Sequence, residues 1–363
     1  MSWRILVINP GSTSTKVAVF DEEKEVFTIN ISHSLEEIHK FHRVVDQFDF
    51  RKEVILKELA SRNIKEDSLR AVVARGGLLK PIPGGTYLVT EKMLEDLRAE
   101  VQGEHASNLG ALIADSIASK LNLPAYIVDP VVVDEQEEVA KVTGLPFIKR
   151  RSIFHALNQK KVARQLAKDI GKAYGELNLI VVHLGGGISV GAHKKGRVVD
   201  VNNALNGDGP FAPERAGSLP AWDLVELCFS KKYSKLEIKN LLAGKGGVVA
   251  HLGTNNMREV KNRVDAGDHQ AELIAKALAY NISKWIGAMA TVLEGQIDGI
   301  VITGGLAHYE DMVNWIKVRC QFIAPFYVYP GGDEMRALAE GALRVLKGEE
   351  AAKIYEKEIR EEK

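Results

Sequence analysis

Two glycine-rich turns, each lying between apolar runs, constrain this chain more than any other feature of its sequence. The first turn is Gly11-Ser-Thr-Ser14, which follows the apolar residues 5–8, and the second is Gly185-Gly-Gly187, which follows residues 179–182. Aligned without a gap, both segments continue into a second apolar run, a charged turn and a third apolar run. Repetition at a matched register indicates one strand–turn–strand–turn–strand unit that is used twice.

The composition of the two turns suggests what they could bind. Glycines and small hydroxyl residues let backbone N–H groups approach a phosphate closely, so two such turns could hold both ends of a polyphosphate. A single glycine-rich turn is usually only a hairpin, and it is the repetition that favours phosphate binding. A third glycine pair, Gly304-Gly305, ends a buried strand at 299–303, where it is either a plain strand-to-helix turn or a surface for adenosine.

Length, charge and cysteine content exclude several classes of protein. The 363 residues suit two domains, and 48 basic residues balance 48 acidic ones, which gives no argument for binding nucleic acid or a membrane surface. Cys228 and Cys320 form neither a disulfide framework nor a metal pattern, which favours a cytoplasmic protein. No apolar run reaches the ~20 residues of a membrane span. The usual motifs of P-loop ATPases, dinucleotide enzymes, zinc proteases and serine esterases are absent.

Strand and helix patterns are mixed along the whole chain. Short apolar runs predict buried strands, and longer amphipathic stretches predict helices. The predicted strands beyond the turns are 71–74, 125–128, 299–303 and 326–329, and the main predicted helices are 34–62, 91–101, 107–121, 155–170, 270–293, 334–346 and 351–360. This mixture indicates an α/β fold, in which binding sites lie beyond the carboxyl ends of strands.

Two motifs carry a resemblance to a known family. Asn9-Pro-Gly-Ser-Thr-Ser-Thr-Lys16 resembles the N-terminal signature of the acetate and butyrate kinases, and His183-Leu-Gly-Gly-Gly187 resembles their second phosphate motif. The resemblance covers nearly the whole chain. It implies the superfamily of sugar kinases, actin and heat-shock ATPases, with two duplicated actin-like (ribonuclease H-like) domains around a central nucleotide cleft. We expect residues 1–148 plus 348–363 to form the N-terminal domain and residues 149–347 the nucleotide-binding C-terminal domain.

The resemblance also implies an activity. Family members phosphorylate a short-chain carboxylate with ATP, using Mg²⁺ or Mn²⁺, and release ADP and an acyl phosphate. Acetate-specific members have asparagine where this chain has Gly186 and bulky aliphatic residues where it has Gly76 and Gly77, so the smaller residues favour butyrate. Acetate, propionate and branched-chain acids remain open as substrates, and so does a non-catalytic, actin-like ATP switch. We expect a homo-oligomer, at least a dimer, that acts on small molecules.

Individual residues take roles from the family pattern. The expected catalytic residues are Arg75, Arg215, His155 and Asp129. The guanidinium groups of the two arginines suit phosphate and carboxylate oxygens. The expected phosphate and nucleotide ligands are Asn9, Ser12, Ser14, Lys16, His183, Gly185, Gly186, Gly187, Arg258, Gly304 and Gly305. The expected substrate pocket comprises Gly76, Gly77, His105 and Phe154, and the metal ligands are Asp129 and Glu334, with Asp333 as the alternative to Glu334. Solvated arginines and acids that only cap helices or form turns are the competing interpretations.

Overall fold

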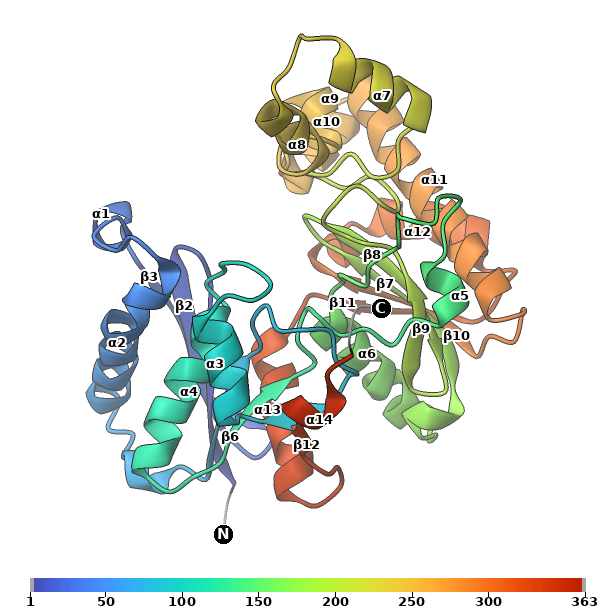
Figure 1. Ribbon diagram of the computed structural model, residues 1–363. Helices are drawn as coiled ribbons and strands as arrows, with labels where there is room; N and C mark the ends of the chain where they lie inside the picture. The colour runs from blue at the N-terminus through green and yellow to red at the C-terminus, as the bar shows by residue number, and fades with distance from the viewer. Residues whose placement is uncertain (1–2, 361–363) are drawn as a thin grey trace. The chain divides into compact units, whose positions relative to one another are not determined.

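Each half of the chain builds one β-sheet with helices on both faces in this computed structural model, which describes residues 3–360 (Figure 1). The first unit comprises Met1–Asp134 and Asp333–Lys363, and the second comprises Glu135–Gly332. The predicted boundaries lie instead at residues 148 and 348. Helix α13 (Glu334–Leu346) accounts for much of this difference, because it packs on strands β1, β4 and β6 of the first unit.

The first unit contains a seven-stranded sheet in the order β12-β5-β6-β4-β1-β2-β3. Its strands are β1 (Arg4–Pro10), β2 (Ser14–Asp21), β3 (Lys24–Ser32), β4 (Ala71–Arg75), β5 (Thr86–Leu88), β6 (Ala125–Val128) and β12 (Lys353–Ile354). Its helices are α1 (Leu35–Ile38), α2 (Phe48–Ser61), α3 (Glu91–Arg98), α4 (Asn108–Lys120), α13 and α14 (Tyr355–Glu358), with 3₁₀ turns at Val44–Gln47 and Glu66–Ser68.

Strand β1 shows why this sheet is covered on both faces. Leu6 and Ile8 pack in one core with residues of α2 and α4. Ile5 and Val7 are also fully buried, and alternation along a strand points them to the opposite face. A continuous apolar run of this kind needs helices on both sides of the sheet, and α4 and α13 both pack on β1.

The second unit contains a five-stranded sheet in the order β11-β10-β7-β8-β9. Its strands are β7 (Asn178–Leu184), β8 (Ile188–Lys194), β9 (Arg197–Val201), β10 (Gly299–Gly304) and β11 (Phe326–Pro330). Its helices are α5 (Glu138–Lys141), α6 (Ala156–Asp169), α7 (Ala221–Phe229), α8 (Lys235–Leu242), α9 (Val248–Leu252), α10 (Met257–Asp265), α11 (His269–Val292) and α12 (Glu310–Cys320), with 3₁₀ turns at Tyr174–Glu176 and Gly305–His308.

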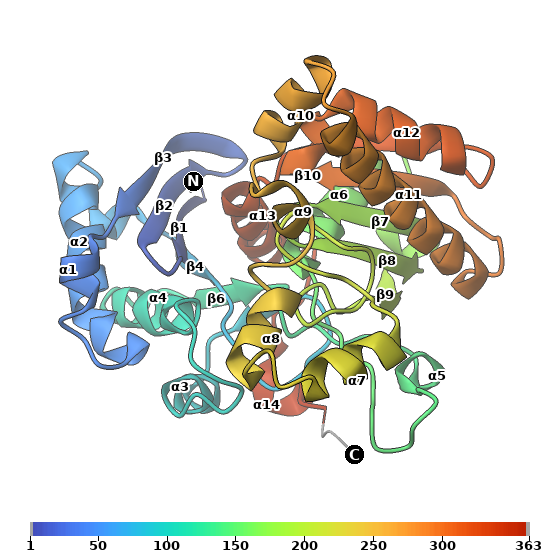
Figure 2. The same ribbon diagram turned by 90° about the horizontal axis from the view of Figure 1, so that it is seen from above.

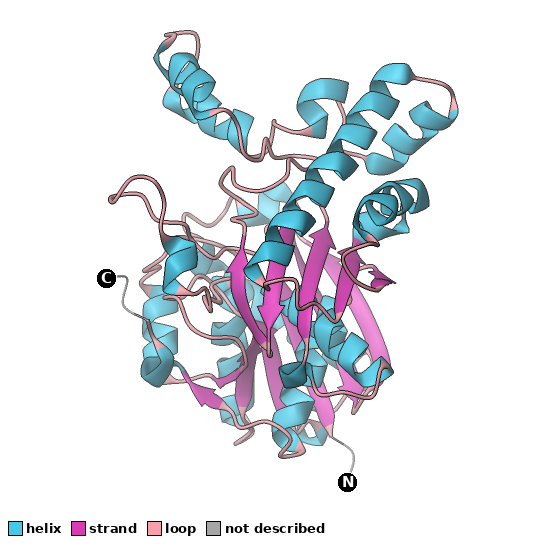
Figure 3. Ribbon diagram, turned by 90° about the vertical axis from the view of Figure 1, so that its right-hand side faces the viewer, coloured by secondary structure: helices cyan, strands magenta, loops and turns pink. Residues whose placement is uncertain are grey.

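Alternation along β7 again divides the apolar residues between two cores. Ile180 and Val182 pack with residues of α11 and α12, which run side by side (Figure 2). Leu179 and Val181 pack with residues of α6 on the other face. Helices and strands therefore mix in both units (Figure 3), as the sequence pattern predicts for an α/β fold.

The two sheets share one topology. The order β3-β2-β1-β4-β6 in the first unit repeats as β9-β8-β7-β10-β11 in the second. In each, two antiparallel hairpin pairs are followed by two parallel pairs. The prediction of duplicated domains is confirmed by this match.

The gapless alignment of the two turns is wrong beyond the turn itself. Four residues lie between the paired Pro10 and Thr15, whereas three lie between the paired Leu184 and Ile188. After the turn Val19 therefore corresponds to Ala192, and the strands of both units carry a register irregularity at this place, after Val19 and after Ala192. A shift of one residue would turn every side chain to the opposite face, so the shorter second turn keeps the apolar positions in the core.

Two predicted helices have a different form. The stretch 34–62 breaks into α1, a 3₁₀ turn and α2. A capping box between Ser34 and Glu37 starts α1, which ends after four residues. The stretch 351–360 contains the two-residue strand β12 and the single turn α14. Lys353 pairs with Tyr87 of β5, and the buried Tyr355 donates a hydrogen bond to Asp96 at 2.9 Å. Between residues 3 and 360, no helix combines the length and apolar character that a bilayer crossing needs.

Candidate functional site

A cavity of about 590 Å³ opens in the first unit, where β1 and β4 end and α13 begins. Its lining residues are Asn9, Pro10, Gly11, Ser12, Ser14, Lys16, Asn30, Arg75, His105 and Glu334. Seven of the predicted site residues therefore lie together in one cavity: Asn9, Ser12, Ser14, Lys16, Arg75, His105 and Glu334. The carboxyl ends of the parallel strands β1 and β4 bring Asn9 and Arg75 there, which is the position that the α/β pattern predicts.

Arg75 and Glu334 form the charged centre of this cavity. Arg75 Nη1 donates to both carboxylate oxygens of Glu334 at 3.1 Å, and Asn9 Nδ2 donates to the same carboxylate at 2.7 Å. Glu334 lies in the first turn of α13, where the helix dipole stabilises negative charge. Asp333 instead caps this helix and pairs with Arg336, so Glu334 is the acid that lines the cavity. The geometry shows that Arg75 can hold a carboxylate.

His105 contributes a hydrogen-bonding group to the cavity. Its Nδ1 accepts from the Ser107 backbone N–H at 3.2 Å, which places the proton of the neutral ring on Nε2. Burial and then the nearby Arg75 lower the pKa of His105. The cationic side chains that line the cavity at neutral pH are therefore Arg75 and Lys16.

Arg51 holds the first glycine turn from behind, and the sequence analysis missed it. The side chain is fully buried in α2, and its guanidinium donates to the carbonyl oxygens of Gly11, Ser12 and Ser14 at 2.7–3.0 Å. No carboxylate within residues 3–360 pairs with it, and burial lowers the pKa of Arg51 to about 10. These carbonyl groups therefore point toward Arg51 rather than into the cavity. The available signal was an arginine on the same helical stripe as Ile55 and Leu59.

Three predicted residues of the first unit do not line the cavity. Asp129 is buried, and its carboxylate accepts from the Gly85 backbone N–H at 2.7 Å. A Cβ on Gly76 would lie 2.6 Å from Pro130 Cβ, and one on Gly77 would lie 2.5 Å from Asn108 Oδ1. Close packing thus accounts for both glycines. Their small size therefore does not indicate room for a longer acyl chain.

In the second unit, Arg215 lies against the second glycine turn. A Cβ on Gly187 would overlap the Arg215 guanidinium, so glycine leaves room for this side chain in its present position. The Glu214 backbone N–H donates to the Gly186 carbonyl at 3.4 Å, which joins the two segments. Burial lowers the pKa of Arg215, and Glu214 opposes this shift. The fold therefore brings a predicted catalytic arginine to a predicted phosphate turn.

Two predicted histidines stack on each other in the same unit. The ring centroids of His155 and His183 are 3.8 Å apart, and the ring planes differ by 12°. His155 precedes the first turn of α6, whereas His183 lies near the end of β7. His183 Nδ1 pairs with Asn158 Oδ1 at 2.6 Å. Phe154, predicted for the substrate pocket, is only 3% exposed and belongs to the buried interior.

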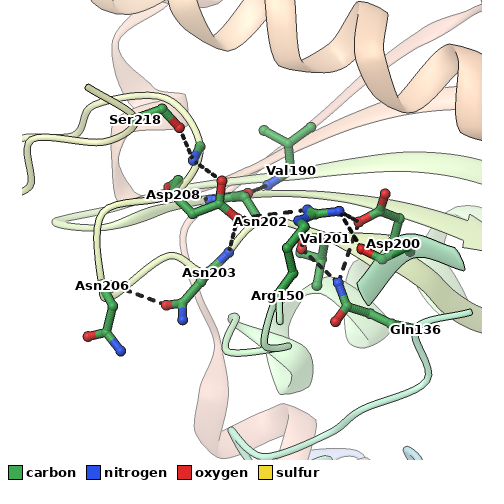
Figure 4. Close-up of polar contacts among 12 residues, drawn as sticks. Gln136, Arg150, Val190, Asp200, Val201, Asn202, Asn203, Asn206, Asp208 and Ser218 are labelled. Carbon is green, nitrogen blue, oxygen red and sulfur yellow. Dashed lines mark hydrogen bonds and ion pairs between the residues drawn. The ribbon is translucent and has the colours of Figure 1, made fainter. Parts of the chain in front are cut away.

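A polar network ties the loop that carries Arg215 to the second sheet (Figure 4). Arg150 donates to Asp200 Oδ1 at 2.8 Å and lies 3.7 Å from Asp208 Oδ2. Asn202 donates to the carbonyl groups of Ile188 and Asp208 at 3.0 and 3.2 Å. Burial raises the pKa of Asp200, although Arg150 counteracts it. Arg150 thus joins Asp200 of β9 to Asp208 of the loop that follows, and Asn202 binds the same part of this loop, which positions the segment leading to Arg215.

The remaining predicted residues differ in their surroundings. Gly304 has φ +91°, and a Cβ there would collide with the backbone of Leu184, so glycine is needed for the approach of β10 to β7. Gly305 faces open space. Arg258 is exposed on α10. Within residues 3–360 no group of three or more His, Cys, Asp or Glu side chains is arranged to hold a metal ion.

Comparison with known proteins identifies relatives of this chain. A model of the acetokinase family matches residues 140–329. The chain is 57% identical to butyrate kinase 1 of Clostridium acetobutylicum over 353 residues, which covers 97% of this chain and 99% of the relative. It is 55% identical to a probable butyrate kinase of Clostridium botulinum over 355 residues, covering 98% and 100%.

Solved structures show the same fold at low sequence identity. Acetate kinase from Porphyromonas gingivalis matches with a TM-score of 0.77 at 19% identity, covering 95% of this chain and all of the other. A propionate kinase from Francisella tularensis matches with a TM-score of 0.73 at 18% identity, covering 93% and 98%. These matches support the predicted two-domain, actin-like architecture.

Proposed function

The chain belongs to the acetokinase family, and from this membership we propose that it transfers the γ-phosphoryl group of ATP to butyrate. The products are butyryl phosphate and ADP, and the reaction is reversible. The observation that carries the choice of substrate is the 57% identity, over nearly the full length of both chains, to a protein named butyrate kinase 1. The cavity supports a carboxylate acceptor, since Arg75 already binds the carboxylate of Glu334 within it.

The chemistry needs charge neutralisation more than proton transfer. A carboxylate with a pKa near 4–5 is ionised at pH 7, judging from side-chain carboxyls, and needs no general base. Repulsion between the carboxylate and the phosphates is the obstacle, which positioned donors overcome. Arg75 and Lys16 of the first unit, and Arg215 of the second, supply positive charge. His155 donates a hydrogen bond to the phosphoryl group, and the two glycine turns hold phosphate oxygens.

The side chains around the cavity fit a hard cation that is also bound by the phosphates of ATP. The oxygen-bearing side chains around the cavity are those of Glu334, Asn9, Asn30, Ser12 and Ser14, and Mg²⁺ prefers oxygen ligands and keeps several waters. Glu334 is the carboxylate that we propose to hold the ion through water. Asp129, whose carboxylate accepts from the Gly85 backbone N–H, does not line the cavity, and we do not propose it as a ligand of this ion. The ion would neutralise charge on the β- and γ-phosphates.

A substrate panel tests this proposal. Acids of two to five carbons are incubated with Mg·ATP, and hydroxylamine traps any acyl phosphate. We expect the highest kcat/KM with butyrate. A maximum at acetate, propionate or a branched acid would reassign the substrate within the class, and ATP hydrolysis without trapped acyl phosphate would instead indicate an ATP-driven switch.

Removal of the metal is a second test. After exhaustive treatment with EDTA we expect activity to fall to background and to return with Mg²⁺ or Mn²⁺ but not with Zn²⁺, since the site offers oxygen rather than sulfur ligands. Full activity in EDTA would contradict the metal requirement.

A further inference from the structure

A continuous chain of hydrogen bonds runs through the second unit from Tyr174 to His155. Tyr174 OH lies 2.7 Å from His193 Nδ1, and His193 Nε2 lies 2.9 Å from Gln159 Oε1. Gln159 Nε2 lies 2.8 Å from Ser189 Oγ, which in turn lies 2.9 Å from His155 Nδ1. The three central side chains are fully buried. We refer to these five residues as the Tyr174–His155 relay.

Local structure explains how the relay is assembled. Ser189, Gly191 and His193 alternate along β8 and therefore share one face of the sheet. His155 and Gln159 are four residues apart at the start of α6 and therefore share one face of the helix. A Cβ on Gly191 would lie 2.5 Å from Gln159 Oε1, so this glycine makes room for the central amide.

Each hydrogen bond of the relay has a definite direction. Gln159 Nε2 also contacts the backbone carbonyl of Ser189 at 3.1 Å, and a carbonyl only accepts, which fixes the orientation of the amide. Gln159 Oε1 then accepts from His193 Nε2–H. Burial lowers the pKa of His193 well below its usual range, and Lys160 and Arg164 add to the effect. The ring is therefore neutral, and its Nδ1 accepts from Tyr174 OH.

The last hydrogen bond of the relay, between Ser189 and His155, also has a definite direction. Ser189 Oγ accepts from Gln159, which leaves its own hydrogen for His155 Nδ1. We infer that the Tyr174–His155 relay fixes neutral His155 as the tautomer that carries its proton on Nε2, ready to donate to an oxygen. That this oxygen belongs to a phosphoryl group rests on the proposed function. Ser189, Gln159 and His193 are then positioning residues, and His155 is the one that touches substrate.

Nuclear magnetic resonance of the ¹⁵N-labelled full chain tests the tautomer without any substrate. The His155 signals are assigned by their loss in His155→Gln. At a pH where His155 is neutral, we expect the wild-type ring to carry its proton on Nε2. Ser189→Ala removes only the last donor and should shift the ring toward a mixture of tautomers. Its kcat should fall on the order of tenfold, well below the ~10⁴ that a wrong tautomer costs a serine protease, with KM for butyrate nearly unchanged.

Two further variants separate positioning from folding. Ser283→Ala makes the same change at another buried serine of this unit, whose hydroxyl donates to the Ala279 carbonyl inside α11, and should alter neither readout. Ser189→Thr keeps the hydroxyl and should restore the tautomer. A wild-type proton on Nδ1, or Ser189→Ala spectra and kcat like those of Ser283→Ala, would overturn the inference. A protein without kinase activity whose His155 tautomer still responds to Ser189→Ala would refute only the proposed function.

Discussion

The two glycine turns occupy equivalent places in the two units but are supported in different ways. The first turn is held through its carbonyl groups by Arg51, a buried cation that reaches it from α2. Within residues 3–360 no buried side-chain cation donates to the carbonyl groups of the second turn, and the Arg215 guanidinium instead occupies the place where a Cβ on Gly187 would lie. The duplicated topology thus conserves the strand–turn–strand frame, while the cation at each turn comes from an unrelated segment. A shared backbone topology therefore does not determine which side chain supports the turn.

Removing the proposed catalytic arginine of either unit, Arg75 or Arg215, should have the largest effect. Arg75→Ala and Arg215→Ala should each lower kcat ~10²–10³-fold, because each removes charge that stabilises the transition state. Steady-state assays of butyryl phosphate formation measure this effect. Arg98→Ala, which deletes an exposed arginine paired with Glu91, is the control and should stay near wild type. A variant at either site with kcat within about threefold of wild type would remove that arginine from the mechanism.

Arg51 should matter for stability and nucleotide binding rather than for the chemical step. Arg51→Met removes the Arg51 donor from three carbonyl groups, of which, in the described part of the chain, only that of Ser14 keeps a backbone donor, the Gly11 N–H at 2.8 Å. A buried polar group that is left unsatisfied costs about 1–3 kcal/mol. We expect a lower urea midpoint and a raised KM for ATP, with a smaller change in kcat than Arg75→Ala causes. Arg51→Lys retains the charge without the fork geometry and should recover part of the stability. If Arg51→Met unfolds at the wild-type urea concentration, the turn does not depend on this anchor.

A pair of alanine substitutions compares the two turns directly. A Cβ on Gly11 would meet Ser14 O at 3.5 Å, an ordinary contact, whereas one on Gly187 would displace the Arg215 guanidinium. We therefore expect Gly11→Ala to retain kcat within about twofold and Gly187→Ala to lose about tenfold, because small misplacements of a catalytic group are costly. Gly186→Ala, whose Cβ would come no closer than 3.6 Å to Glu214, controls for the second turn. Equal losses in Gly11→Ala and Gly187→Ala would refute the proposed difference.

The smallest expected effect concerns pH. Burial lowers the pKa of His33 in the first unit, and lowers that of His193 in the second unit further. Below about pH 6.5 each of these histidines binds a proton in the unfolded chain but stays neutral in the folded protein. The free energy of unfolding therefore decreases as the pH falls, by at most about 1.4 kcal/mol per pH unit for each ring. Urea midpoints at pH 7.5, 6.5 and 5.5 measure this slope. His193→Gln should flatten it more than His33→Gln does, and an unchanged slope in His193→Gln would contradict the assignment.

Many of the residues that line the cavity could be predicted from the sequence because they lie near strand ends. Asn9 and Arg75 follow buried apolar runs, and parallel strands bring their carboxyl ends to one edge of a sheet. Glu334 was foreseeable as an acid at a helix start, although its choice over Asp333 was not. Only the fold showed that Asp333 turns to Arg336, while Glu334 turns to Arg75.

Packing, by contrast, could not be read from local patterns. Gly76 and Gly77 suggest an enlarged pocket in the sequence, yet their missing side chains make room for Pro130 and Asn108. Asp129 suggests a metal ligand at a strand end, yet its carboxylate binds the backbone of Gly85. In each case a residue more than 30 positions away in the sequence determines what the glycine or the aspartate contacts.

The sequence by itself determined the class and repetition of the fold, since alternating and continuous apolar runs leave few ways to bury a strand. It also indicated which residues of the first glycine turn line the cavity, because their chemistry and their place after a strand are local properties. The tertiary structure alone decided the length difference between the turns, the anchor at Arg51 and the Tyr174–His155 relay. The physical reason is that hydrogen-bond direction and close packing depend on pairs of groups. Arg51 is about 40 residues from the carbonyl groups it binds, and Ser189 is 34 residues from His155.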